Sequence, residues 1–446
     1  MTAGSQTSKA IQQENMDIVL SEIRSSADEA RFPTILSQRK QSEVVNRILA
    51  ERLETVLPVA MRETGLDMWL IICQEDNFDP VFTTLIPMDT WCPILQILVF
   101  FDRGPRQGVE RINLSMTETG NLYERPWKGK HHPEQWPMLR EIIEARNPKR
   151  IGINIGSVEW AAGGLTYNLH KQLIDNLPQK FVERLESAEP VATRWLATLT
   201  DEEIGLYEQV TNVAHAIIAE CYSRKTIIPN ITTTDDLVWH YWQRSADLGL
   251  SLSFRPFFNL VRSDEAKEKC GPEDNVIRPG DCIHCDIGIK YLRLNSDHQE
   301  WAYILRHGED DAPEGLRRLM AEGNRLQDIF MSEFKRGLTG NEILHNILER
   351  AKRENVPNPK VYSHSLGYFL HEPGPLIGLP WEQNLCEGRG DVRLEHNYSF
   401  TMELSVEAPV PEWGGQMIRM SLEQDVVYTQ GVCWPMNGRQ TKFHLL

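Results

Sequence analysis

Two aspartates set eleven residues apart are the residues of this sequence most suited to chemistry. Asp286 and Asp297 lie near the two ends of the stretch CDIGIKYLRLNSD, which reads as two short strands joined by a tight turn. With the turn at Tyr291 and Leu292, antiparallel pairing places the two carboxylates directly opposite each other on one face. Like charges so placed repel, and the preceding CIHC run is expected to be buried, so a bound cation is the simplest way to accommodate both.

Two glutamates further along the chain repeat this arrangement. The run IRPGDCIHCD ends at Asp286 and the run LEHNYSFTME ends at Glu403, so each carboxylate occupies the tenth position. Gly280 and Asn397 share the fourth position, and both residue types tolerate the left-handed backbone that starts a strand here. Glu403 and Glu423 each lie inside a strand-like run. We therefore expect four carboxylates to converge between two half-sheets.

The order of predicted elements around these runs also occurs twice. A helix with a capping box at Thr200, and a second helix over DDLVWHYWQRSADLG, precede the first strands. A long helix after Ala312, and a helix with a capping box at Thr339, precede the second strands. This duplication predicts an α+β domain over residues 196–446 with an internal pseudo-twofold repeat.

Two histidines lie between the carboxylate pairs. His364 and His371 flank Gly367 in the stretch YSHSLGYFLHEPGP. Two aspartates, two glutamates and one or two imidazoles make an oxygen-rich site that suits two ions of Mn, Fe, Co or Zn, whereas Ca²⁺ less often recruits histidine. Two such cations polarise a carbonyl and activate water, so the predicted chemistry is hydrolysis.

The region before residue 196 has a different pattern. The apolar runs LDMWLIIC, ILQILVFF and RIGINIG alternate with helical segments, which predicts an α/β domain over residues 36–195. Residues 1–35 are polar and irregular, and we expect either a loosely held leader or an arm that packs on a partner chain.

Composition limits the classes of partner. The 446 residues include 47 basic and 63 acidic ones, giving a net charge of -16, and the sequence contains no dense Lys/Arg run. Nucleic acid and membranes are therefore not expected as partners, whereas a small molecule or peptide is. No segment approaches the roughly 18 apolar residues of a membrane span, and no signal peptide pattern is evident, so we expect a cytoplasmic protein.

Taken together, these motifs resemble the pita-bread metallopeptidase family, which includes methionine aminopeptidase, aminopeptidase P, prolidase and the metal-free creatinase. The matching stretches, CDIGIKYLRLNSD, SHSLGYFLHEPG, FTMEL and SLEQDVVYT, fall within residues 200–446. The α/β region resembles the creatinase-type N-terminal domain that accompanies aminopeptidase P and prolidase. The resemblance therefore implies a creatinase-like domain followed by a pita-bread catalytic domain.

The resemblance also implies a role for each candidate residue. Asp286 and Asp297 would bind one divalent ion, His364 and Glu403 would bind the other, and Asp297 and Glu423 would bridge the two. Glu403 would in addition carry a proton from the attacking water to the leaving amine. A further residue, His371, would contact the substrate and stabilise the developing charge. Mn is the expected metal, with Co, Zn or Fe as alternatives.

The implied activity is that of an Xaa-Pro aminopeptidase or dipeptidase, and relatives with this first domain form homo-oligomers, commonly dimers. Two positions depart from the proline-handling relatives: Lys269 stands where they usually carry histidine, and Ser421 where they tend to carry arginine. Two alternatives follow from these departures and from the fold itself. One is a metal-dependent enzyme acting on a non-peptide substrate, and the other is a non-catalytic binding protein.

Overall fold

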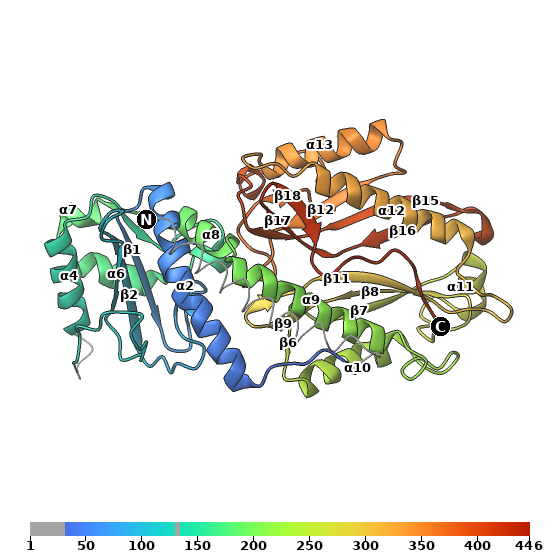
Figure 1. Cartoon of the computed structure of the whole chain (residues 1–446), viewed down its shortest axis with the longest axis horizontal. Coiled ribbons are helices and arrows are strands. Elements are labelled where there is room, and N and C mark those ends of the chain that lie inside the picture. The colour runs from blue at the N-terminus through green and yellow to red at the C-terminus, as the bar shows by residue number, and fades with distance from the viewer. Residues whose placement is uncertain (1–31, 130–133) are drawn as a thin grey trace, which may run out of the picture.

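The computed structural model describes residues 32–129 and 134–446, which form an N-terminal α/β domain and a C-terminal α+β domain (Figure 1). This confirms the predicted order of fold classes along the chain. Most of the leader predicted for residues 1–35 lies outside the described residues, and only its last four belong to them.

Those four residues, 32–35, pack against the C-terminal domain of their own chain. The guanidinium of Arg244 lies 4.6 Å from the centre of the Phe32 ring. The side chain of Gln209 donates a hydrogen bond to the Thr34 carbonyl at 3.4 Å. Residues 32–35 thus contact the C-terminal domain of their own chain, and the arm on a partner chain stays a prediction.

The N-terminal domain is built on a five-stranded mixed sheet in the order β3-β2-β1-β4-β5. β1 pairs antiparallel with β2 and parallel with β4. Because β1 is central and covered on both faces, its residues are apolar without alternation, as the run MWLIIC shows. The strands are β1 (Met68–Gln74), β2 (Leu95–Asp102), β3 (Val109–Asn113), β4 (Ile151–Ile153) and β5 (Leu185–Ser187).

Helices cover this sheet, and the longest of them reaches toward the second domain (Figure 1). It is α2, which buries one apolar stripe and ends at Gly65 with a left-handed backbone, φ 71°. The helices of the domain are α2 (Gln38–Thr64), α3 (Phe82–Leu85), α4 (Gln135–Arg146), α5 (Glu159–Ala162), α6 (Tyr167–Asn176), α7 (Gln179–Val182) and α8 (Glu189–Ala197).

The C-terminal domain contains the predicted repeat of two helices followed by strands. Its first half comprises α9 (Asp201–Cys221), α10 (Thr234–Asp247), β6 (Ser251–Leu252), β7 (Phe257–Val261), α11 (Asp264–Cys270), β8 (Cys282–Ile287), β9 (Ile289–Tyr291), β10 (Leu294–Asn295) and β11 (His298–Tyr303). Its second half comprises α12 (Glu314–Ser332), α13 (Gly340–Arg353), β12 (Lys360–His364), β13 (Leu376–Ile377), η2 (Arg389–Asp391), β14 (Tyr398–Thr401), β15 (Glu403–Val410), η3 (Pro411–Trp413), β16 (Gln416–Leu422), β17 (Asp425–Thr429), β18 (Val432–Pro435) and β19 (His444–Leu445).

The local signals that predicted this repeat are present in the structure. Both capping boxes form, at Thr200 before α9 and at Thr339 before α13. Gly280 and Asn397 both adopt left-handed backbone, with φ 94° and 62°. The strands lie between α9 and α10 on one side and α12 and α13 on the other (Figure 1). Strands of both halves thus lie between the two helix pairs, where side chains from the two halves can meet.

The hairpin register differs from the predicted one. The turn falls at Leu292 and Arg293, both with positive φ (54° and 70°), and not one residue earlier. Gln299, and not Asp297, is consequently the residue opposite Asp286, and Asp297 falls in the break between β10 and β11. Two-residue turns of this kind usually carry Asn-Gly or Asp-Gly, so the Leu-Arg pair gave no signal of the turn position.

A buried ion pair joins the two domains. Arg52 of α2 and Glu203 of α9 lie 2.7 Å apart (Nη1 to Oε2), and both side chains are almost fully buried. The guanidinium also lies over the rings of Trp195 and Tyr368, at 4.5 and 4.9 Å from their centres. The Tyr368 hydroxyl donates to the other Glu203 oxygen at 2.6 Å. This network ties the N-terminal domain to the segment that carries the two candidate histidines.

Candidate metal centre

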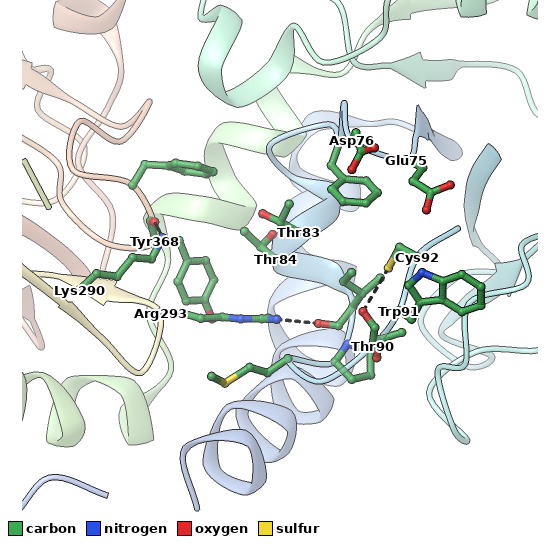
Figure 2. Close-up of a pocket in the computed structure, with 15 residues that line it drawn as sticks. Glu75, Asp76, Thr83, Thr84, Thr90, Trp91, Cys92, Lys290, Arg293 and Tyr368 are labelled. Atoms are coloured by element: carbon green, nitrogen blue, oxygen red, sulfur yellow. Dashed lines mark hydrogen bonds between the residues drawn. The ribbon is translucent and has the colours of Figure 1, made fainter. Parts of the chain in front are cut away.

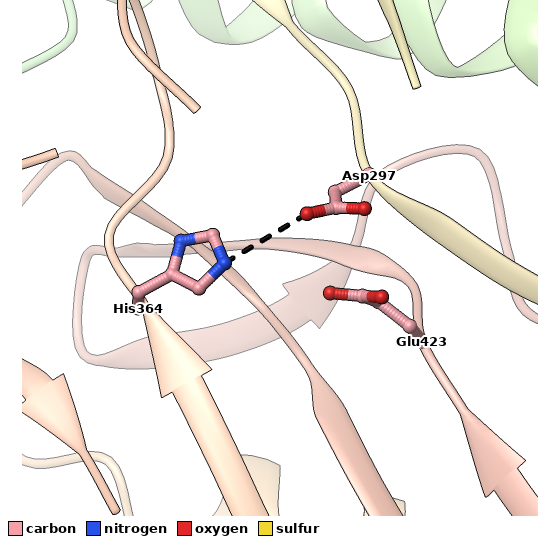
Figure 3. A group of neighbouring side chains, drawn as sticks. All are labelled: Asp297, His364 and Glu423. Carbon is pink, nitrogen blue, oxygen red and sulfur yellow. Dashed lines mark ion pairs between the residues drawn. The ribbon is translucent and has the colours of Figure 1, made fainter. Parts of the chain in front are cut away.

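Three side chains from separate segments meet inside the C-terminal domain. Asp297, His364 and Glu423 are buried, and one ligand atom of each lies within 4.8 Å of the others. Figure 3 shows the imidazole facing both carboxylates, with 3.7 Å between His364 Nε2 and Asp297 Oδ2. His364 ends β12, whereas Asp297 and Glu423 occupy the breaks between β10 and β11 and between β16 and β17.

The tautomer of His364 follows from its surroundings. Its Nδ1 lies 3.2 Å from the Ser365 carbonyl, so Nδ1 carries the proton and donates it. Burial, and the neighbouring His371, hold the pKa of His364 well below its usual range. The lone pair of Nε2 therefore faces the carboxyl groups of Asp297 and Glu423. A cation at this position would be coordinated by the imidazole and by both carboxylates.

Each of the two carboxyl groups, Asp297 and Glu423, has one oxygen without a hydrogen-bond partner among the described residues. These oxygens, Asp297 Oδ1 and Glu423 Oε1, are both buried. Burial, and repulsion from neighbouring carboxylates, raise the pKa of both groups well above the usual range. Buried polar atoms are nearly always satisfied, so these two oxygens together with the histidine lone pair fit a divalent metal.

The other two predicted ligands lie beside this group and are half-buried. Burial raises the pKa of Asp286, in β8, to about 7. Burial together with the charge of Asp286 raises the pKa of Glu403, the first residue of β15, to about 8. Repulsion from both carboxylates contributes to the raised pKa of Asp297. The structure thus brings the five sequence-predicted ligands together, three of them in the tight group and two at its side.

Asp297 and Glu423 lie at strand breaks, whereas the sequence placed each inside a continuous strand. The backbone N–H of Asp297 donates to the side chain of Asp425, Oδ1, at 3.1 Å, in place of a strand partner. Glu423 pairs through its backbone with Gln299 as an isolated bridge. Where strand pairing is interrupted, a side chain no longer has to follow the alternating directions of a regular strand. This allows Asp297 and Glu423 to point toward His364.

Gln299 is a site residue that the sequence reasoning missed. Its Nε2 donates to Glu423 Oε2 at 2.7 Å and to Glu403 Oε1 at 3.0 Å. Its Oε1 lies 3.0 Å from Nε2 of His284, so this histidine has a hydrogen-bond partner outside the tight group. The register alone could have revealed Gln299, because it is the residue opposite Asp286.

Trp160 and Arg389, which lie near His371, are two further site residues that the sequence analysis did not predict. The ring centre of His371 lies 4.4 Å from that of His364. The indole of Trp160, from the N-terminal domain, donates to the His371 carbonyl at 2.6 Å. The guanidinium of Arg389 lies 5.5 Å from the centre of the Trp160 ring, and its buried Nε has no hydrogen-bond partner within the described chain. Burial and this guanidinium lower the pKa of His371. Nothing in the irregular sequence around Arg389 marks it as a site residue.

The two departures noted in the sequence have plain structural settings. Lys269 lies on the exposed face of α11 and forms an ion pair with Glu265 at 2.5 Å. Ser421 lies in β16 opposite Ser405, and its carbonyl accepts a hydrogen bond from the Trp301 indole. The nearby Arg419 is exposed. Arg389 is therefore the arginine that the structure places beside the candidate histidines.

A cavity of about 540 Å³ lies between the two domains (Figure 2). From the C-terminal side, Lys290 donates to the Tyr368 carbonyl at 3.0 Å, and Arg293 donates to the Ile86 carbonyl at 3.0 Å. The N-terminal side contributes acidic, hydroxyl and aromatic groups: Glu75, Asp76, Thr83, Thr84, Thr90 and Trp91. The segment between His364 and His371 thus borders both the metal-ligand group and this cavity.

The fold and the buried carboxylate–histidine group define a two-domain protein of the metallopeptidase type. A sequence profile of metallopeptidase family M24 matches residues 205–430, and the chain belongs to this family. A search of curated protein sequences gave no match. No helix within the described residues is both long and apolar enough to cross a membrane.

Solved structures share the whole two-domain fold. An X-Pro aminopeptidase from Thermotoga maritima is 15% identical, with a TM-score of 0.60 over 87% of this chain and 100% of its own. An Xaa-Pro dipeptidase from Bacillus anthracis is 17% identical, with a TM-score of 0.55 over 90% and 100%. The N-terminal domain of FACT complex subunit SPT16 from Cicer arietinum is 12% identical, with a TM-score of 0.55 over 89% and 98%. These likenesses confirm the predicted pita-bread fold with its preceding α/β domain.

Proposed function

We propose that this protein is a dinuclear-metal hydrolase that cleaves a small peptide or peptide-like amide, and that Xaa-Pro peptides are its most suitable substrates. The observation that carries the proposal is the buried group of Asp297, His364 and Glu423, with its two unsatisfied oxygens and its histidine lone pair. Membership of family M24 and the fold shared with Xaa-Pro peptidases support it.

Five side chains would hold the two cations: Asp286, Asp297, His364, Glu403 and Glu423. When bound, divalent cations supply Lewis acidity that polarises an amide carbonyl toward attack by water. Carboxylate and imidazole ligands suit Mn, our first choice, as well as Co, Zn or Fe. The burial of the group keeps bulk water away and so strengthens every charge interaction inside it.

Glu403 and His371 would carry the proton and charge steps. Glu403 lies beside the tight group and not within it, and burial together with the charge of Asp286 raises its pKa to about 8. In the reaction it would accept a proton from the attacking water and return it to the leaving amine. His371 is kept neutral by its lowered pKa, so it offers one N–H to an oxygen that gains negative charge. Trp160 holds the His371 backbone through the carbonyl hydrogen bond.

Arg389 would read the substrate. Its guanidinium lies beside Trp160, close enough to lower the pKa of His371, and it retains an unused buried donor in the described structure. A planar guanidinium binds a carboxylate through two parallel hydrogen bonds, so a short peptide with a free C-terminal carboxylate fits this position. We also expect a cytoplasmic homodimer, as the family resemblance implies.

The first experiment measures metals per chain by elemental mass spectrometry after dialysis against Mn, Co, Zn and Fe in turn, followed by a screen of Xaa-Pro dipeptides and tripeptides. Two metals per chain, lost in Asp297→Ala and retained in the exposed control Asp247→Ala, together with Xaa-Pro cleavage, would establish the proposal. A metal-free protein, or a metal-loaded protein that cleaves no amide, would contradict it.

A non-catalytic binding protein is the second candidate. It is favoured by the fold shared with the SPT16 N-terminal domain, which covers 89% of this chain. The metal measurement separates the two candidates, because a binding protein retains its partner when the ligand residues are replaced. A metal-dependent enzyme with a non-peptide substrate would bind metals and fail only in the peptide screen.

A further inference from the structure

The cavity of about 540 Å³ between the two domains is separate from the metal-ligand group (Figure 2). Among the described residues that line it there is none of the five proposed ligands, and His371 is not one of them either. Its C-terminal wall consists of Lys290, Arg293, Tyr368 and Phe369, and the N-terminal domain supplies the rest. The volume is that of a binding site for a small organic molecule.

The C-terminal wall carries two half-buried cations, Lys290 and Arg293, that form no ion pair with any described residue. Lys290 Nζ donates to the Tyr368 carbonyl at 3.0 Å, and Arg293 Nη2 donates to the Ile86 carbonyl at 3.0 Å. Burial and the charge of Arg293 lower the pKa of Lys290, with only partial compensation from Glu372, and burial lowers the pKa of Arg293. Because buried charges are normally paired, this wall is suited to an anion.

The backbone at Arg293 is held in a conformation that arginine rarely adopts. Its φ is 70°, in the left-handed region that favours glycine and asparagine. The guanidinium crosses the domain boundary and reaches the Ile86 carbonyl (Figure 2). Strained backbone of this kind is concentrated at active sites and ligand-binding sites. The turn therefore keeps a charged side chain at the cavity although a smaller residue would fit its backbone better.

The N-terminal wall has the opposite charge and an aromatic surface. Glu75 and Asp76 are exposed and lie across the cavity from Lys290 (Figure 2). Trp91 is 73% exposed and Phe78 is 38% exposed, so both rings present apolar surface at the cavity. A ligand that suits both walls has a negative end, a positive end and an apolar body. An inorganic anion would be repelled by the two carboxylates.

We propose that this cavity binds a free amino acid with an aromatic or large apolar side chain. The carboxylate of the ligand would meet Lys290 and Arg293, its ammonium group would meet Asp76, and its side chain would lie against Trp91. A guanidinium that donates to one carbonyl still has donors for a carboxylate. The inference is independent of the proposed hydrolase activity, because none of the metal ligands belongs to this site.

The test is calorimetric titration of the chelator-stripped full chain with L-phenylalanine and with two relatives that each lack one charge. N-acetyl-L-phenylalanine has no ammonium group, and L-phenylalaninamide has no carboxylate. L-phenylalanine should bind at one site per chain and raise the thermal midpoint, since it contacts both domains. Each relative should bind at least about tenfold more weakly, because one wall of the cavity is left without its partner. Inorganic phosphate should also bind more weakly than L-phenylalanine.

Variants of both walls locate the binding. Arg293→Asn suits the left-handed backbone and Lys290→Met keeps the length of the side chain, so the two do not share one risk of misfolding. Each should lower the affinity for L-phenylalanine by at least about tenfold. Asp76→Asn, also at a left-handed position (φ 62°), should weaken the binding of L-phenylalanine but not of N-acetyl-L-phenylalanine. Lys335→Met, at an exposed lysine of the C-terminal domain, is the matched control.

Arg389→Met separates this cavity from the proposed substrate position and should leave the affinity for L-phenylalanine unchanged. Four results would overturn the inference: unchanged affinity in both cation variants, equal binding of the three phenylalanine derivatives, tighter binding of phosphate, or no binding of L-phenylalanine up to about 10 mM. Each of them would leave the hydrolase proposal standing, since the titration contains no metal.

Discussion

The indole N–H of Trp160 donates a hydrogen bond to the carbonyl of His371, with 2.6 Å between nitrogen and oxygen, across the boundary between the two domains. The same indole lies under the Arg389 guanidinium. The N-terminal domain therefore contacts the segment that carries a candidate catalytic residue, and it does so through a residue of the short helix α5. This contact gives the first domain a direct part in positioning the site.

Trp160→Phe removes the hydrogen bond and keeps an aromatic ring. A single neutral hydrogen bond contributes about 0.5–1.5 kcal/mol, so we expect kcat/KM for an Xaa-Pro peptide to fall by roughly twofold to tenfold. Metals per chain should not change, because none of the proposed ligands contacts Trp160. Trp239→Phe, on the exposed face of α10, is the control and should leave both quantities as in the wild type. Metal loss in Trp160→Phe would contradict this positioning role.

Arg389→Met removes the charge proposed to bind the substrate carboxylate. A charge-assisted hydrogen bond contributes about 1.5–3 kcal/mol, so KM for a dipeptide should rise by roughly tenfold to a hundredfold, with a smaller change in kcat. A C-terminally amidated substrate should lose far less, because it lacks the carboxylate. Arg393→Met, an exposed arginine of the same loop, serves as the control. An equal rise in KM for both substrates would show that Arg389 does not bind the substrate carboxylate.

Local sequence pattern predicted some of the site residues and missed others. Asp286 and Asp297 followed from residue type and spacing, since a cation resolves the repulsion of clustered carboxylates. The choice of His364 as a ligand came from the family resemblance. The hairpin register was wrong because its turn carries Leu-Arg, which hides the position of a turn that needs two left-handed residues. The residue paired with Asp286 is therefore Gln299 and not Asp297, two positions further along the chain, so Gln299 was missed.

The rest of the site could not be read from local pattern at all. Trp160 reaches His371 only after the two domains pack, and Arg389 comes near His371 only through the fold of the C-terminal domain, so no spacing in the sequence encodes either relationship. The fold was more accessible: capping boxes and apolar runs placed the main helices and strands. Arg52 illustrates the limit, because a charged residue within a helix reads as solvent-facing, yet it is fully buried between the domains.

Arg52→Met should strongly destabilise the protein. It leaves the Glu203 carboxylate buried without its positive partner, and breaking a buried pair in this way costs about 3–5 kcal/mol. The double variant Arg52→Met with Glu203→Gln should recover a large part of the loss, because the unpaired charge is gone. Thermal midpoints of the wild type, the two single variants, the double variant and the exposed control Arg318→Met provide the comparison. A double variant no more stable than Arg52→Met would show that the ring contacts of Arg52 dominate.

Glu372→Gln should be more stable than the wild type, and the difference in stability should grow with pH. Glu372 is fully buried; Oε1 accepts a hydrogen bond from the Phe369 N–H at 3.1 Å, and Oε2 has no partner among the described residues. Burial raises its pKa to about 7, partly offset by the Phe369 hydrogen bond and by Arg52, whereas the unfolded chain has a value of about 4.3. Ionisation is thus harder in the folded state, and the wild type loses stability as the pH rises from about 4 to about 7.

The glutamine cannot ionise, so its advantage over the wild type in free energy of unfolding should grow through that window and remain at about 4 kcal/mol above pH 7. The measurement is the difference in thermal midpoint between Glu372→Gln and wild type at pH 5 and at pH 8.5, with Glu387→Gln on the exposed surface of a nearby loop as control. Using the difference cancels the titration of the other carboxylates, which both proteins share. A gap that is the same at the two pH values would mean that Glu372 is already ionised in the folded protein at pH 5.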